Sequence, residues 1–330
     1  MNKLIVVAVC ALISTSLHAK EFTFGLWGDM PYARNGDAPK MQAVLDSINA
    51  SDIQFSLYDG DIKDGSSKCT DDVYTSAASM FNSLKKPVVY IPGDNEWTDC
   101  HRTNNGGYNN LERLEYIRKT MFATDQSYGQ TKLKLTMQGA PGKKFAENTR
   151  FEASGIVFVG LNVPGSNNNL VIDAKDCSNK SARTPADCEA GNAEYLERDQ
   201  SNIAWLKSSF AAAKTSSAKG IVVAFQADPG FDLPETEDEN ESKQTKFKGY
   251  QAFMDAVVNQ AEQYTGQVLL VHGDTHFFKV DKPLRNPSNM LTNVTRVQTF
   301  GSPSNHWVHV TVDTDRAEVF TIRPVIVKQK

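Results

Sequence analysis

In the N-terminal third of the chain, short apolar runs alternate with stretches whose apolar residues recur at helical spacing. Residues 22–27, 53–57 and 87–91 are typical of buried strands, and residues 40–50 and 73–84 are typical of amphipathic helices. The resulting β-α-β-α-β order is the pattern of a parallel sheet covered by helices. It predicts an α/β fold.

The rest of the chain also mixes strands with helices. Strands are expected at residues 133–137, 144–151, 156–161, 221–225, 268–271, 295–300, 307–312 and 317–322, and helices at residues 193–213 and about 250–263. A chain of 330 residues allows one large α/β domain or two ordinary ones. Because no internal repeat and no clear linker divides it, we expect a single domain with two packed sheets over residues 20–330.

The N-terminus has the features of a signal peptide. Met1–Lys3 is a short positive segment, residues 4–13 are apolar, and Leu17–Ala19 is a plausible cleavage site before Lys20. About 10 apolar residues are too few to span a bilayer, and no later segment approaches the roughly 20 that are required. We therefore expect residues 1–19 to be removed and the protein to be exported, to the periplasm or outside the cell; the alternative is a buried N-terminal strand or helix.

Charge and composition exclude several classes of protein. The chain has 35 Lys and Arg against 39 Asp and Glu, a formal net charge of −4, and so lacks the basic surface of a nucleic-acid or anionic-membrane binder. At 40% hydrophobic and 22% charged residues it is a globular protein rather than a disordered one. The sequence motifs of serine hydrolases, P-loop NTPases and dinucleotide-binding enzymes are absent from it.

Four cysteines remain after the signal peptide and its Cys10 are set aside, and four cysteines allow three pairings. An even number suits an oxidising compartment. Cys177 and Cys188 would close a short polar loop, while Cys69 and Cys100 lie on loops that follow neighbouring predicted strands. We predict the disulfides Cys69–Cys100 and Cys177–Cys188.

Five aspartates lie at or just past the C-terminal end of a predicted strand: Asp29, Asp61, Asp94, Asp228 and Asp274. In parallel α/β sheets these ends converge on one edge, where ligands bind. One such aspartate is ordinarily a turn residue or a helix cap, but five at one edge would repel one another unless cations lay between them. His276 adds a nitrogen donor. The pattern predicts a site for two divalent ions, of the kind that binds a phosphate and generates a hydroxide nucleophile.

The same residues lie in five short motifs, in this order: Gly28-Asp29, Gly60-Asp61-Ile62-Lys63-Asp64-Gly65, Gly93-Asp94-Asn95-Glu96, Val223-Ala224-Phe225-Gln226 and Gly273-Asp274-Thr275-His276. Their order and spacing resemble the motifs D-x-H, G-D-x-x-D-x-G, G-N-H-[DE], an apolar strand ending in His, and G-H-x-H of calcineurin-like metallophosphoesterases. The resemblance covers about residues 22–281. It implies a four-layer αββα sandwich whose two-metal site hydrolyses phosphate mono- or diesters, with a small-molecule phosphate ester as substrate.

Five positions depart from the family pattern. Pro31 and Gln226 stand where the family has histidines, Asp94 replaces the asparagine ligand, Asn95 replaces the catalytic histidine, and Asp274 replaces the first histidine of the last motif. The resemblance assigns Asp29, Asp61 and His276 to one ion. To the other ion it assigns Asp61, Asp94, Asp274 and as a further candidate Gln226, with Asp228 in reserve. Hard oxygen ligands favour Mn²⁺ or Mg²⁺, with Ca²⁺ as an alternative, over Zn²⁺ or iron.

The catalytic residues are the least defined part of the site. Asn95 can donate a hydrogen bond to a phosphate, but it cannot supply a proton. His101 would substitute if its loop folds back, and Arg102 would then bind a phosphate oxygen; otherwise His101 is a solvated loop residue. The competing hypothesis is a protein that retains the fold and binds metal ions or anions without catalysis. Residues 165–169 either line the mouth of the site with amides or form a polar surface loop.

Overall fold

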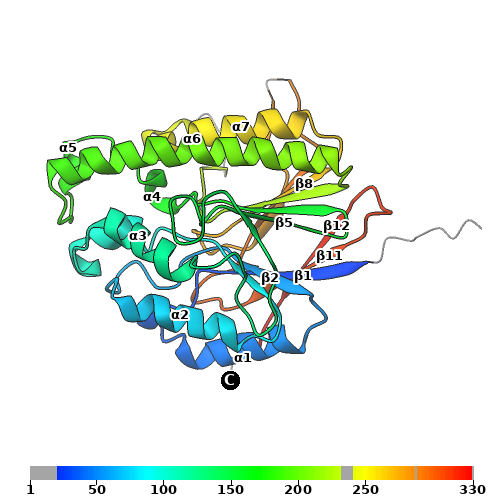
Figure 1. The fold of residues 1–330 in the computed structure, drawn as a ribbon, viewed down its shortest axis with the longest axis horizontal. Coiled ribbons are helices and arrows are strands. Elements are labelled where there is room, and N and C mark those ends of the chain that lie inside the picture. Colours follow the sequence, from blue (N-terminus) through cyan, green and yellow to red (C-terminus); the bar gives the residue numbers. More distant parts are fainter. Residues whose placement is uncertain (1–20, 232–240, 287, 329–330) are drawn as a thin grey trace, which may run out of the picture.

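The computed structural model describes residues 21–231, 241–286 and 288–328. Two β-sheets lie face to face, and helices cover the outer face of each (Figure 1). The predicted signal peptide, residues 1–19, lies outside the described residues. Within the described ranges, no helix is long and apolar enough to cross a membrane.

The first sheet has five strands in the order β12-β11-β1-β2-β3. β1 (Phe22–Trp27), β2 (Phe55–Tyr58) and β3 (Val88–Tyr90) are parallel, as the alternation of strands and helices predicts. β11 (Trp307–Val312) pairs antiparallel with β1, and β12 (Phe320–Val325) pairs antiparallel with β11.

The second sheet has seven strands in the order β4-β5-β6-β7-β8-β10-β9. Its four central strands, β6 (Ile156–Gly160), β7 (Gly220–Ala224), β8 (Gln267–His272) and β10 (Val294–Gln298), are parallel. Antiparallel strands flank them: β4 (Thr136–Met137) and β5 (Thr149–Ala153) on one side, and β9 (Lys279–Asp281) on the other.

Three separate apolar clusters hold the layers together. The cluster between the sheets contains Phe24, Phe55 and Phe158. A second cluster joins the first sheet to α1 (Ala38–Ala50), α2 (Asp71–Ser83) and α3 (Asn110–Met121), and a third joins the second sheet to α6 (Pro185–Thr215) and α7 (Gln251–Glu262). The predicted four-layer αββα sandwich is confirmed.

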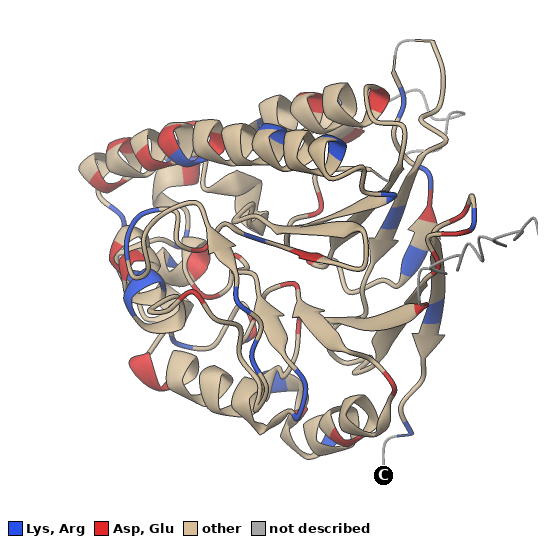
Figure 2. Ribbon diagram, turned by 45° about the vertical axis from the view of Figure 1, so that its right-hand side comes forward, with Lys and Arg blue, Asp and Glu red and all other residues tan. Residues whose placement is uncertain are grey.

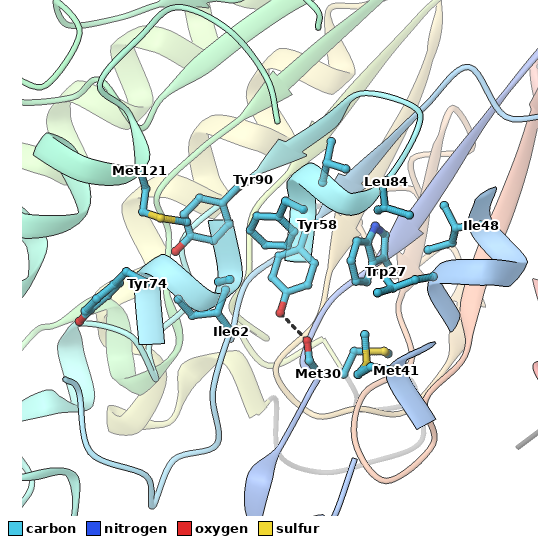
Figure 3. Close-up of a cluster of buried hydrophobic side chains, with 14 of the residues drawn as sticks. Trp27, Met30, Met41, Ile48, Tyr58, Ile62, Tyr74, Leu84, Tyr90 and Met121 are labelled. Atoms are coloured by element: carbon cyan, nitrogen blue, oxygen red, sulfur yellow. Dashed lines mark hydrogen bonds between the residues drawn. The ribbon is translucent and has the colours of Figure 1, made fainter. Parts of the chain in front are cut away.

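The second cluster also supports the edge of the sheet where the predicted site lies. Trp27 and Tyr58 pack edge to face in it, with ring centroids 4.8 Å apart. The Tyr58 hydroxyl donates a 2.7 Å hydrogen bond to the Met30 carbonyl (Figure 3), and a 3.0 Å bond to the Asp61 carbonyl. The core residue Tyr58 thus ties together the two loops that carry Asp29 and Asp61.

Several elements differ from the sequence-based prediction. α6 begins at Pro185 rather than at 193, because Thr184 and Asp187 form a capping box ahead of the expected start. β5 begins at residue 149 rather than at 144. Helix α3 and strand β9 were not predicted. Charged residues of both signs are interspersed along the outer helices, so the ribbon shows no single basic face (Figure 2).

Both predicted disulfides are confirmed. Cys69–Cys100 links residues 31 apart in the sequence, and Cys177–Cys188 links residues 11 apart. The first joins the loop after β2 to the loop after β3, and the second joins α5 (Ala174–Ser178) to the start of α6.

Candidate metal centre

The loops that leave β1, β2, β3 and β8 bring their acidic residues together at one edge of the two sheets. Asp29, Asp61 and Asp274 have positive φ angles of 51°, 63° and 74°. This left-handed conformation is uncommon for residues other than glycine and is concentrated at functional sites. It turns each loop sharply directly after its strand, so the carboxylates remain at the strand ends.

The first group of donors is Asp29, Asp61 and His276, whose ligand atoms all lie within 4.8 Å of one another. His276 Nε2 lies 3.3 Å from Asp29 Oδ1. Its other ring nitrogen, Nδ1, lies 2.6 Å from the carbonyl oxygen of Ser302. A carbonyl at Nδ1 holds the proton there and leaves Nε2 to face the carboxylates, which is how a metal-binding histidine is usually oriented.

The second group is Asp61, Asp94 and Asp274, again within 4.8 Å of one another. Asp61 belongs to both groups. The backbone of Gly165 packs directly against this group, since a Cβ at that position would lie 2.6 Å from Asp94 Oδ2. Only glycine fits there without displacing the carboxylate.

Gln226 contacts the second group through its nitrogen. Its Oε1 accepts a hydrogen bond from the Gly165 N–H, so its Nε2 faces Asp94 Oδ1 at 3.3 Å and Asp274 Oδ1 at 3.2 Å. In this orientation the amide nitrogen of Gln226 donates to the two carboxylates, and its amide oxygen is turned away from them toward Gly165. Asp228 accepts from the Gly230 N–H in its own turn, while its backbone N–H donates to Asp274.

Asp61, at the centre of the site, receives hydrogen bonds from two neighbours. Asn95 donates to Asp61 through its backbone N–H at 3.1 Å and its side-chain amide at 2.7 Å. The Tyr32 hydroxyl lies 3.0 Å from Asp61 Oδ2 and 3.2 Å from His276 Nε2. Tyr32 is thus a buried neighbour of the first donor group, with only 2% of its surface exposed.

Three further buried carboxylates surround the donors, and the sequence prediction did not single them out. Asp59 and Glu96 are fully buried, and Asp99 is 1% exposed. Glu96 Oε1 accepts from Gly93 N–H, Asp61 N–H and the Tyr90 hydroxyl, so it fixes the turns that carry Asp61 and Asp94. The sequence does carry a signal for two of them, because Asp59 directly precedes the Gly60-Asp61 motif and Glu96 ends the motif that begins at Gly93.

Burial and mutual repulsion raise the pKa values of these acids. Burial is the largest cause at Asp61 and Asp274, where the pKa lies well above its usual range, and the nearby Asp94 charge adds to it. Burial likewise raises the pKa of Asp29, against the opposing effect of His276. Burial lowers the pKa of His276, but the contacts with Asp29 outweigh it and raise the pKa to about 9.

The donor set fits divalent cations. Several buried carboxylates at one edge are electrostatically unfavourable without a cation, as the raised pKa values of Asp61 and Asp274 indicate. The first group offers one imidazole and carboxylate oxygens, and the second offers carboxylate oxygens only.

His101 and Arg102 lie beside this centre rather than within it. Arg102 forms a 2.5 Å ion pair with Asp99 and donates to Ser166. His101 is buried in the 3₁₀ helix Thr98–His101. Burial, together with the charges of Arg183 and Arg102, lowers the pKa of His101 to about 3, so the ring is neutral at neutral pH. Both residues line a pocket next to the centre.

Ser166 connects that pocket to the centre. It lies in α4 (Gly165–Asn168), a single turn in which Ser166, Asn167 and Asn168 have positive φ, as does Asn169 after it. Three asparagine side chains anchor this left-handed turn: Asn167 accepts from Gly249 N–H, Asn168 accepts from Arg198, and Asn169 accepts from Asn110. Residues 165–169 are therefore a fixed wall of the site, not a polar surface loop.

No protein-family model and no curated protein sequence matches the chain. Among solved structures, GAP50, the anchor in the inner membrane complex of Plasmodium, is 14% identical with a TM-score of 0.44, over 94% of this chain and 90% of that one. The 5'-nucleotidase of Candida albicans is 11% identical with a TM-score of 0.42, over 93% of this chain and 51% of the enzyme. The sulfate thiohydrolase SoxB of Thermus thermophilus is 10% identical with a TM-score of 0.41, over 88% of this chain and 42% of the enzyme.

Proposed function

We propose that this protein is an exported, metal-dependent phosphoesterase of the calcineurin-like type, with residues 20–330 as a single domain. The observation that carries the proposal is the pair of overlapping donor groups that share Asp61. A carboxylate common to two groups holds two ions close together, which is the arrangement that serves hydrolysis of phosphate esters. The two disulfides support export, because such bonds persist in oxidising compartments.

Each residue of the centre has a proposed role. Asp29, Asp61 and His276 would hold one ion, and Asp61, Asp94 and Asp274 would hold the other. The ions, when bound, polarise the phosphate and lower the pKa of a water molecule so that it can attack. Gln226 orients Asp94 and Asp274 through its amide, and Glu96 fixes the turns of Asp61 and Asp94. Asn95 exchanges its hydrogen bond to Asp61 for one to a phosphate oxygen.

The proposal is tested by hydrolysis of generic phosphomonoesters and phosphodiesters with Mn²⁺ or Mg²⁺, before and after chelation. Asp61→Asn removes the shared charge and should abolish both activity and the binding of the second ion. Asp46→Asn, on the exposed face of α1, is the matched control and should change neither. A wild-type protein that is inactive under all these conditions, with unchanged metal content in Asp61→Asn, would refute the proposal.

The second candidate is a metal- or anion-binding protein without catalysis. It is favoured by the position of His101, which lines the adjacent pocket and is neutral at neutral pH, so His101 does not take the place of the family's catalytic histidine. Calorimetry separates the two functions. Tight binding of Mn²⁺ and phosphate without turnover of any ester would favour the second.

A further inference from the structure

A pocket of about 310 Å³ opens beside the candidate metal centre. Its wall includes the 3₁₀ helix Thr98–His101, part of α4, and residues from the segment that runs on to Arg183. Ser166 belongs to both sites: its Oγ lies 2.8 Å from Asp94 Oδ2 and 2.7 Å from Asp99 Oδ1. A ligand in the pocket would therefore lie one side chain away from the carboxylate of Asp94.

Arg183 gives the pocket a positive charge that is not part of an ion pair, although the carboxylates of Asp176 and Asp99, which also line the pocket, act on it. Its guanidinium donates to two neutral oxygens, Ser181 Oγ at 3.2 Å and the Asp176 carbonyl at 2.9 Å. No carboxylate of the described residues forms an ion pair with it, and it is half-buried. The other two cations of the lining differ, since Arg102 is paired with Asp99 and Lys246 with Glu241. A partly desolvated guanidinium without a carboxylate partner is a site for an anion.

His101 is also subject to the positive charges of Arg183 and Arg102. His101 is 8% exposed, and its Nδ1 has no hydrogen-bond partner among the described residues. The neighbouring charges of Arg183 and Arg102 act with burial to lower its pKa. A negatively charged group bound among these three side chains would offset the repulsion that disfavours the imidazolium. Arg183 and His101 thus both favour a bound anion, against the opposing charge of Asp176 in the same lining.

The remaining lining limits the kind of molecule that carries the anion. Leu170, Val171 and Ile172 provide aliphatic contacts. Among the described residues that line the pocket there is no Phe, Tyr or Trp, and so no aromatic ring on which a nucleobase could stack. A volume of about 310 Å³ lies at the low end of the range for small-molecule sites. These features suit a short aliphatic chain that ends in a charged group.

Backbone contacts hold the pocket in shape. The Ala182 N–H donates to the His101 carbonyl at 2.9 Å, and the Thr103 N–H donates to the Lys180 carbonyl at 2.9 Å. The two disulfides lie at the ends of these segments, because Cys100 precedes His101 and Cys177 follows Asp176. A site that is rigid before binding loses less entropy on binding.

We propose that this pocket binds a second anionic group of the substrate, with Arg183 as its specificity determinant. Resting on the phosphoesterase function proposed above, this assigns the substrate class: small aliphatic phosphate esters whose alcohol part carries a carboxylate or a second phosphate. The scissile phosphate lies at the metal centre. The carbon chain passes Ser166 and contacts the aliphatic lining, and the distal anion reaches Arg183.

The test compares three esters of equal carbon length: propyl phosphate, 3-phosphooxypropanoate and propane-1,3-diyl bisphosphate. The metal-loaded wild type should hydrolyse one of the two esters that carry a second anionic group with a kcat/KM above that of propyl phosphate. The two esters show whether the pocket takes a carboxylate or a phosphate. In Arg183→Gln this preference should fall by about 10-fold or more, the effect of losing one hydrogen bond to a charged group. Arg316→Gln, an exposed arginine near Asp313, is the control and should keep it.

A binding measurement keeps the inference separate from the phosphoesterase proposal. Calorimetric titration of succinate into the metal-loaded protein should show binding that weakens by about 10-fold or more in Arg183→Gln, with circular dichroism confirming the fold. If no ester is hydrolysed, the phosphoesterase function fails and the succinate titration alone decides the pocket. Succinate that binds both proteins equally, or neither, overturns the inference. So does ester hydrolysis without preference for a substrate that carries a second anionic group.

Discussion

Metal binding at the candidate centre should be strongly pH-dependent, because His276 must lose a proton before Nε2 can bind an ion. Asp29 lies 3.3 Å from Nε2 and holds the proton there, so the pKa of His276 is raised from 6.5 to about 9. At about pH 7, two units below this pKa, removing the proton costs about 2.7 kcal/mol, or a factor of about 100 in affinity. Affinity should therefore rise by at least about 10-fold per pH unit and level off above about pH 9.

The assay is calorimetric titration of Mg²⁺ into chelator-treated protein at several pH values and in two buffers with different heats of ionisation. The buffer dependence gives the number of protons released, which should be at least one per ion at neutral pH. Asp61 and Asp274, whose pKa values are also raised, add to that number. In His276→Gln, one proton should disappear from the count. An affinity independent of pH, with no proton released, would refute this reasoning.

The raised pKa of His276 also affects the stability of the metal-free protein, which should decrease as the pH rises, whereas metal affinity should increase. A folded-state pKa above the unfolded value of 6.5 means that the protonated His276 stabilises the fold. This contribution is complete below about pH 6.5 and is lost as the pH rises through about 9. The melting temperature of the chelated protein should therefore decrease as the pH rises from about 6.5 to about 9. Over the same range, the difference in melting temperature between the metal-loaded and the chelated protein should grow.

Three further predictions concern metal choice and stability. Chelation should lower the melting temperature, and Mn²⁺, Mg²⁺ or Ca²⁺ should restore it at least as well as Zn²⁺, since binding only to the folded state at 100 times Kd stabilises by about 2.7 kcal/mol; equal melting curves in verified metal-free protein would contradict this. Asp274→His should shift the preference towards Zn²⁺, measured by competition between ions, because it replaces a hard oxygen with nitrogen. Cys69→Ser with Cys100→Ser should lower the free energy of unfolding, measured in urea, by roughly 3–4 kcal/mol, because this disulfide joins residues 31 apart. Replacing Cys177 and Cys188, which are 11 residues apart, should lower it by roughly 3 kcal/mol. An equal or larger loss for the Cys177–Cys188 pair would contradict the dependence on loop length.

The sequence predicted the parallel strands and the position of the five aspartates, because both follow from a local rule. Apolar runs define where the strands end, and parallel strands end at one edge. Asp29, Asp61 and Asp274 therefore lie together in the structure as the motif order indicates. The disulfide Cys69–Cys100 follows from the same topology, since its cysteines leave neighbouring strands.

The features that sequence reasoning missed depend on distant parts of the chain. The orientation of Gln226 depends on the Gly165 N–H, 61 residues away. His101 faces the pocket because the segment around Ala182 pairs with its backbone. Helix α3 escaped prediction because it buries two arginines, Arg113 and Arg118, on its inner side, which weakens the apolar pattern that marks a helix. Arg118 is compensated there by Glu147, a partner that no local pattern reveals.

The left-handed turn of α4 sets the order in which the molecule can be assembled. Consecutive left-handed residues are unfavourable by themselves, at roughly 1–2 kcal/mol each for ordinary side chains. The bonds that compensate for this come from Asn110, Arg198 and Gly249, which are 59, 30 and 82 residues away from their partners. The turn therefore cannot be stable in a nascent chain that ends before residue 249. The Ser166–Asp94 contact, and with it the edge of the metal centre, should therefore become ordered only after Gly249 has been made.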